Sequence, residues 1–100
     1  ELGREIVVHL DTARPGGAGP EWDAAFEEAV RKAAGLALKF LSRGERVGLL
    51  CGELFVPPAM GPLHRTTVLT ALALVEAGSG GPPPLALPPG VALYRVRAAA

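Results

Sequence analysis

The residue best placed for chemistry in this sequence is Asp11, which follows the apolar run of residues 6–10. An apolar run that ends in one acid is typical of a buried parallel strand that presents a carboxylate at the carboxyl edge of its sheet. Mg²⁺ requires near-octahedral oxygen ligation, and in the next loop Ala13 and Pro15 stand where hydroxyl ligands would be needed. The sequence therefore predicts no functional metal site, with Asp11 as a weak candidate ligand.

Cys51, His9 and His64 raise the question of nucleophilic catalysis, in which a histidine activates a thiol. His9 lies inside an apolar strand, so we expect its side chain to point to a face of the sheet and not to the edge. A lone free cysteine is usually a small buried apolar residue, and no Cys and His pair has the spacing of a zinc site. We predict that the protein is not an enzyme and holds no cofactor, and that His64 is a surface histidine.

The glycine-rich run of residues 16–19 precedes an expected helix, as a phosphate-binding loop does. It lacks the Gly-Lys-Ser/Thr ending of such loops, and Pro20 removes an amide that would hold the anion, so we predict no nucleotide site. Asp11 more simply caps its own loop or pairs locally. If Arg14 points inward, its guanidinium would pair with Asp11 and replace a metal ion.

Composition narrows the classes of partner. Ten basic and ten acidic residues cancel in this chain of 100 residues, so no net field attracts nucleic acid. Apolar runs are broken well before a bilayer-spanning length, which predicts no membrane segment in this chain. The chain has no Asn or Gln and is richer in Arg than in Lys, a usage that overlaps with that of heat-stable proteins from GC-rich genomes and favours a thermophilic source. We expect a soluble domain, either cytoplasmic or part of a membrane-anchored longer protein.

Hydrophobic periodicity indicates how these residues are positioned. It predicts strands over residues 5–10, 46–51, 54–56 and 91–96, and helices over residues 20–43 and 62–77. A type II′ turn at Gly52 and Glu53 would make the third strand antiparallel. A right-handed crossover then gives one α/β domain with a short, mostly parallel sheet of order 3-2-1-4. Its core would span residues 1–77, with a Gly/Pro-rich connection over 78–90 and the final strand and tail over 91–100.

Three separated segments carry a family resemblance: residues 4–11, 26–30 and 43–50. In this order they resemble the bacterial family called domain of unknown function fifty-eight, over residues 4–77. That family is similar to the von Willebrand factor A domain, a Rossmann-like doubly wound sheet, and its genes often lie beside those of MoxR-type AAA ATPases. The resemblance implies a truncated von Willebrand A-like fold and a MoxR-type AAA ATPase as a possible protein partner.

The resemblance also implies a degenerate adhesion motif. Von Willebrand A domains hold Mg²⁺ through an Asp-x-Ser-x-Ser loop, a threonine and a later aspartate, and here only Asp11 matches, with Thr66 or Thr67 in place of the threonine. We therefore expect a non-enzymatic protein-interaction module with a lost metal site, and a homodimer through an edge strand. The alternative is weak Mg²⁺-dependent ligand binding by Asp11 and one of the two threonines. The candidate partner-binding residues are Asp11, Thr12, Arg14, Thr66 and Thr67.

Overall fold

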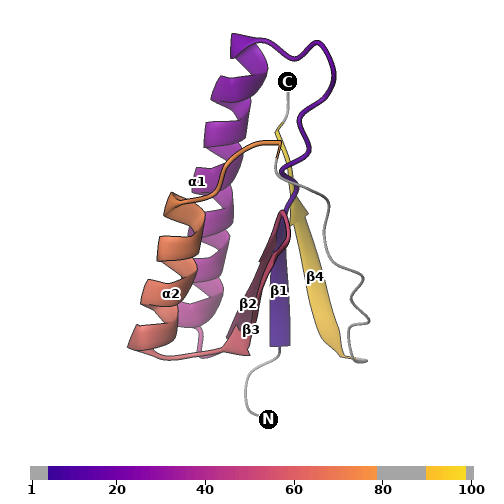
Figure 1. Cartoon of the computed structure of the whole chain (residues 1–100). Helices are drawn as coiled ribbons and strands as arrows, with labels where there is room; N and C mark the ends of the chain where they lie inside the picture. Colours follow the sequence, from indigo (N-terminus) through magenta and orange to yellow (C-terminus); the bar gives the residue numbers. More distant parts are fainter. Residues whose placement is uncertain (1–4, 79–89, 99–100) are drawn as a thin grey trace.

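The structure is a computed structural model that describes residues 5–78 and 90–98. The elements follow one another as β1 (Glu5–Leu10), α1 (Pro20–Ser42), β2 (Arg46–Cys51), β3 (Leu54–Ala59), α2 (Pro62–Ala73) and β4 (Val91–Val96). The strands form one sheet of order β3-β2-β1-β4 in which β3 alone is antiparallel to its neighbour. Figure 1 shows both helices on the same face of this sheet. The predicted α/β class and strand order are confirmed.

The central strand β1 is buried because it has a parallel neighbour on each side. Val8 lies between Leu49 of β2 and Tyr94 of β4 in the register of the sheet. Residues 6–10 are all buried, as an apolar run in the middle of a parallel sheet should be. This strand therefore delivers Asp11 to the carboxyl edge of the sheet, beside the end of β4.

Small and aromatic residues of α1 share one face and pack it on the sheet. Ala29, Ala33 and Ala37 are buried at four-residue spacing, which lets the helix backbone approach the strands closely. Phe40 contacts Tyr94 of β4, with ring centroids 4.9 Å apart. The helix begins at Pro20 and is followed by Gly44 in a left-handed conformation, close to both predicted limits.

The β2–β3 hairpin turns as predicted, but β3 is longer than the sequence indicated. Gly52 has a φ of 58°, and Glu53, like every other non-glycine residue that the structure describes, has no positive φ, which is the pattern of a type II′ turn. We expected Pro57 and Pro58 to end the strand, yet β3 runs on to Ala59. An irregularity between Val47 and Leu49 shifts the register there, and prolines are tolerated at such an edge bulge.

Helix α2 is shorter than its apolar spacing predicted, because it ends at Ala73 and not near Ala77. The chain leaves the helix at Leu74, and the Gly78 N–H donates to the Thr12 carbonyl oxygen over 2.8 Å. This bond draws the chain towards the loop after β1. The N-terminal half of α1 consequently extends beyond the end of α2 (Figure 1).

Two further points concern the limits of these elements. The predicted connection over residues 78–90 lies outside the described residues except for its two terminal glycines. Among the described residues, no helix has the length and apolar character that crossing a bilayer requires.

Candidate functional site

The ends of β1 and β4 form one wall of a cleft at the carboxyl edge of the sheet. Both strands run in the same direction, so Asp11 after β1 and Arg97 after β4 meet at this edge. The cleft measures about 660 Å³ and is lined by Asp11, Ala13, Arg14, Pro15, Trp22, Arg97 and Ala98. Open α/β sheets bind ligands at this kind of edge, which makes the cleft the candidate functional site.

Asp11 is engaged in the structure of its own loop. Its Oδ1 accepts a hydrogen bond from the Ala13 N–H at 3.0 Å, and its own N–H donates to the Val96 carbonyl oxygen at 2.8 Å. The first bond is a local side-chain turn of the kind that aspartate favours after a strand. The interpretation of Asp11 as a loop-capping residue is thereby confirmed.

Arg14 pairs with Asp23 and not with Asp11, so the hypothesis of an ion pair in place of a metal ion is wrong. Its Nε lies 3.2 Å from Oδ1 of Asp23 and its Nη2 lies 3.3 Å from Oδ2. Nη2 also donates to the Ala18 carbonyl oxygen at 3.0 Å, and the guanidinium lies 5.9 Å from the centre of the Trp22 ring. Arg14 thus clamps the glycine-rich loop to the first turn of α1.

Trp22 and Phe26 form the apolar support behind this clamp. Their rings stack with centroids 5.3 Å apart and planes 11° from parallel, and both side chains are buried. The four-residue spacing of this pair on a helix favours packing over a ligand cage, and the stacked rings are packed in this way. Trp22 nevertheless lines the cleft beside Arg14.

Thr12, Thr66 and Thr67 are not part of this cleft. Thr12 is only 3% exposed, so its side chain offers a partner almost no surface. Because β3 is antiparallel, α2 begins near the opposite edge of the sheet, at the start of β2. There the Thr66 and Thr67 hydroxyls donate to the carbonyl oxygens of Pro62 and Leu63, at 3.2 and 3.1 Å. The structure does not bring them to Asp11.

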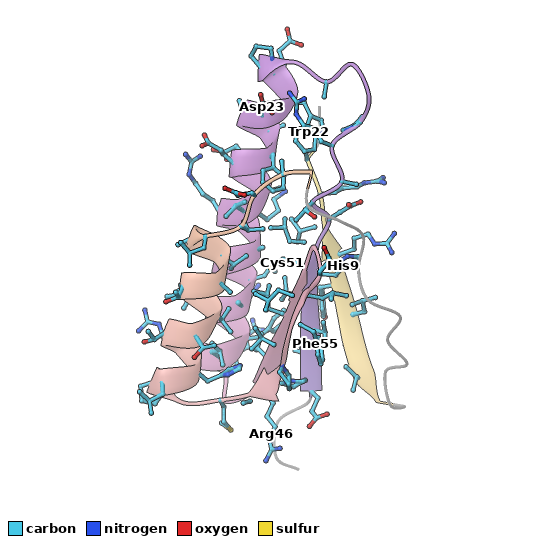
Figure 2. All side chains as sticks on the ribbon, in the orientation of Figure 1. His9, Trp22, Asp23, Arg46, Cys51 and Phe55 are labelled. Carbon is cyan, nitrogen blue, oxygen red and sulfur yellow. The ribbon has the colours of Figure 1, made fainter. Side chains whose placement is uncertain are left out.

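The two histidines and the cysteine are also separated. Leu10 and its neighbour Cys51 face the helices, whereas His9 lies on the other side of the sheet (Figure 2). His64 is part-buried, and its Nε2 donates to the carbonyl oxygen of Val47, so the prediction of a surface histidine was wrong. Within residues 5–78 and 90–98, no three His, Cys, Asp or Glu side chains gather in a way that could hold a metal ion.

Burial keeps the Cys51 thiol protonated. The side chain belongs to the core between the sheet and the helices, and this burial raises the pKa of Cys51 above its ordinary value. A thiolate is the reactive form of cysteine, and its formation here is disfavoured. Cys51 therefore acts as a small apolar core residue.

Burial shifts the pKa of His9 in the opposite direction to that of Cys51, because the charged form of histidine is the protonated one. Desolvation lowers the pKa of His9, the nearby Arg95 lowers it further, and Asp11 partly opposes both. The neutral imidazole is therefore the form that the folded protein favours.

Stability should depend on pH through His9. Because its pKa is lowered in the folded state, the unfolded chain takes up the proton first once the pH falls below about 6.5. We expect the free energy of unfolding to decrease from there until the pH reaches the lowered folded pKa. Urea unfolding at steps between about pH 7 and pH 5 measures this slope, which the His9→Phe variant should reduce. An unchanged slope in the variant would contradict the assignment to His9.

Reasoning from sequence missed Trp22 and Arg97 as residues of the cleft and Asp23 as the ion-pair partner of Arg14. The expected Asp11 and Arg14 line the cleft. Asp23 is an acid in the first turn of α1, where its charge complements the helix dipole, and this alone accounts for its place in the sequence. The ion pair of Asp23 with Arg14 depends on how the glycine-rich loop folds back on α1, and the spacing of residues in the sequence does not reveal this.

No protein-family model, curated protein or solved structure matches this chain in the comparisons made with them. The family resemblance of residues 4–77 therefore stays an expectation.

Proposed function

We propose that this chain is a non-enzymatic protein-interaction module with a lost metal site, and that it associates with a second copy of itself through β4. The observation that carries the proposal is the difference between the two edges of the sheet. Edge strands present backbone hydrogen-bonding groups to other chains unless the protein blocks them. The two edges here differ in how far they are blocked.

The β3 edge carries features that discourage pairing. Pro57 and Pro58 remove two backbone N–H donors, and the register irregularity opposite them distorts the strand. In contrast, β4 has no proline over its six residues and is hydrogen-bonded to β1 alone among the strands that the structure describes. Its Leu93 side chain is 48% exposed. An apolar edge strand of this kind is suited to strand addition by another chain.

A symmetric antiparallel pairing of two β4 strands is compatible with their sequence. With the two-fold axis through Leu93, each Leu93 faces its copy and each Arg95 faces Val91 of the other chain. The two guanidiniums then avoid each other, whereas an axis through Arg95 would place like charges opposite. The pairing centred on Leu93 is therefore the one that we propose.

The state of the reactive groups supports a non-enzymatic role. Asp11 is bonded within its loop, Arg14 is paired with Asp23, and Cys51 is buried. A Mg²⁺ site built from Asp11 and Thr66 or Thr67 would require groups from opposite edges of the sheet to meet, so we do not propose it. A MoxR-type AAA ATPase as partner remains a prediction that rests on the resemblance alone.

Sedimentation velocity over a concentration series tests the association. We expect a reversible dimer, and we expect Leu93→Lys to raise the dissociation constant by about tenfold or more because it places like charges opposite each other. Leu63→Lys is the matched control, since Leu63 is 85% exposed on α2 and distant in sequence from β4. A wild-type chain that stays monomeric at millimolar concentration would remove the proposal, as would equal effects of the two variants.

A further inference from the structure

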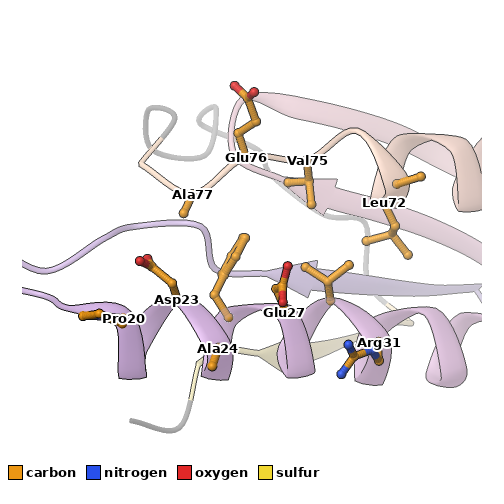
Figure 3. Close-up of a pocket in the computed structure, with 12 residues that line it drawn as sticks. Pro20, Asp23, Ala24, Glu27, Arg31, Leu72, Val75, Glu76 and Ala77 are labelled. Atoms are coloured by element: carbon orange, nitrogen blue, oxygen red, sulfur yellow. The ribbon is translucent and has the colours of Figure 1, made fainter.

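Two grooves lie on the helical layer, and they differ in the charge of their side chains. The larger, of about 860 Å³, runs between the N-terminal half of α1 and the segment from Leu72 to Ala77 (Figure 3). Its lining carries charges of both signs, and its Asp23 and Arg31 are already held in ion pairs. Charge therefore does not identify what would bind in this larger groove.

The second groove lies at the other end of the helices, between the last turns of α1 and the first turn of α2. It measures about 680 Å³, and Figure 1 shows these two helix ends side by side. Its apolar side chains are Leu38 and Leu41 of α1 and Pro62 of α2. Of the lining residues that the structure describes, none belongs to β4 or to the carboxyl edge of the sheet. We call it the α1–α2 groove.

Two cationic side chains line the α1–α2 groove, and none of its described lining residues is an acid. Lys39 lies on α1 and Arg65 on α2, and both are exposed. Neither the Lys39 ammonium nor the Arg65 guanidinium has an ion-pair partner among the residues that the structure describes. The groove therefore combines an apolar surface with two cations that are available to a partner.

Helix stability does not account for both of these cations. Lys39 lies in the last turn of α1, where a cation complements the helix dipole. Arg65 is the fourth residue of α2 and lies near the positive end of that helix, where a cation opposes the dipole. The charge of Arg65 is thus unfavourable to its own helix, and an acidic group bound beside it would offset this.

Gly35 leaves open space along the same groove. It lies exposed within α1, and a Cβ atom built on it would meet nothing within 4 Å. Alanine is the better helix former at such a position, so the glycine lowers helix stability and leaves room for a side chain of an occupant. A larger side chain at this position would fill that room without a clash.

We propose that the α1–α2 groove binds a short amphipathic helical segment of a partner protein, with apolar residues on one face and glutamate or aspartate beside them. The acids pair with Lys39 and Arg65, and the apolar face covers Leu38. Helical walls bond their own backbone groups, so they offer an extended strand no backbone partners, whereas a helical segment needs none. The wall from Gly35 to Ser42 is roughly 10 Å long at the helical rise, which accommodates about two helical turns.

A pair of synthetic peptides of opposite charge tests the groove. The first is a 14-residue amphipathic helix made of leucine and glutamate with blocked ends, and the second replaces every glutamate with lysine. Each is titrated into the isotopically labelled full chain carrying Leu93→Lys, with amide shifts followed by NMR. We expect saturable shifts at Leu38, Leu41 and Arg65 with the glutamate peptide, and at least fivefold weaker binding of the lysine peptide. Equal binding of the two peptides, or shifts only outside the groove, would overturn the proposal.

Two matched pairs of variants on α1 separate charge from shape. Lys39→Glu reverses a charge in the groove, whereas Lys32→Glu makes the same change at an exposed position outside it. Gly35→Leu fills the groove, whereas Ala24→Leu adds the same side chain at an exposed position outside it. We expect the first variant of each pair to weaken binding of the glutamate peptide at least fivefold and the second less than twofold, with circular dichroism confirming that all four fold. Equal effects within either pair would overturn the proposal.

The inference rests on the proposed interaction function but uses a surface separate from β4, so the two can fail independently. Loss of dimerisation in Leu93→Lys with binding of the glutamate peptide would support both proposals. A β4 dimer whose groove binds neither peptide would overturn the groove proposal alone. Binding of the glutamate peptide by a wild-type chain that is always monomeric would overturn only the β4 proposal. A Leu93→Lys chain that still dimerises until Lys39→Glu is added would place a second copy in the groove and would overturn both.

Discussion

Replacing Gly48 with alanine is expected to lower the free energy of unfolding by about 3 kcal/mol, because backbone atoms of β3 occupy the space that a side chain would need. A Cβ atom built on Gly48 would lie 2.7 Å from the carbonyl oxygen of Val56 and 2.9 Å from the nitrogen of Pro58. Both are backbone atoms of β3, so relief requires the hairpin to separate at its register irregularity. Urea denaturation measures the change, which is large for a domain of this size.

Gly35 supplies a control with the same chemical substitution and the opposite expected sign. It lies exposed in the middle of α1, and a Cβ atom there would meet nothing within 4 Å. Gly35→Ala should stabilise the protein by about 0.5–1 kcal/mol, since alanine is the better helix former. If Gly48→Ala instead left stability within about 0.5 kcal/mol of the wild type, the close approach of β2 and β3 at Gly48 would be incorrect.

The second large effect is expected at Leu49, where truncation to alanine should cost about 3 kcal/mol of stability. Leu49 is 0% exposed and lies in β2 between Val8 of β1 and Val56 of β3. Its side chain belongs to the core that the helices cover, so Leu49→Ala removes buried apolar atoms and leaves a cavity. Thermal and urea unfolding of the variant measure the loss.

Leu63 is the matched control for this truncation. It is 85% exposed in the first turn of α2, and it has no core contact to lose. Leu63→Ala should therefore change the free energy of unfolding by less than about 0.5 kcal/mol. Similar losses in the two variants would show that the core lies elsewhere than between the helices and the β1–β2 pair.

Local pattern was sufficient to predict the sheet and the longer helix. The apolar run before Asp11 indicated a buried parallel strand, and hydrophobic periodicity indicated the helix that packs on it through Ala29, Ala33 and Ala37. The handedness of crossovers and the turn at Gly52 then left few ways to order four strands. Order β3-β2-β1-β4 follows from these constraints, which is why it could be predicted without a structure.

Tertiary contacts set the element boundaries that hydrophobic periodicity could not predict. The apolar spacing of α2 continues to Val75, yet the bond between Gly78 and Thr12 redirects the chain and the helix stops at Ala73. Prolines end most strands, but the space left by Gly48 accommodates Pro57 and Pro58 inside β3. In each case a residue distant in sequence sets the boundary, and periodicity carries no information about it.

In the candidate site, too, local sequence pattern predicted some positions and tertiary contacts set the others. Asp11 was placed at the carboxyl edge by the strand before it, and the structure confirms that position. From the sequence, Arg14 could pair with any acid that the glycine-rich loop brought near. In the structure its partner is Asp23. Thr66 and Thr67 were assigned to the edge of Asp11 by resemblance, whereas the antiparallel direction of β3 places the start of α2 at the other edge.

The register between β1 and β4 also sets an order of events in folding. Glu5 pairs with Val91, so the inner strand β1 and its edge neighbour β4 lie far apart in the sequence. The hairpin and the first crossover can form from local contacts, but one side of β1 stays open until β4 has been synthesised. On a ribosome, β1, whose residues 6–10 are buried in the folded sheet, therefore waits with one exposed backbone edge for β4.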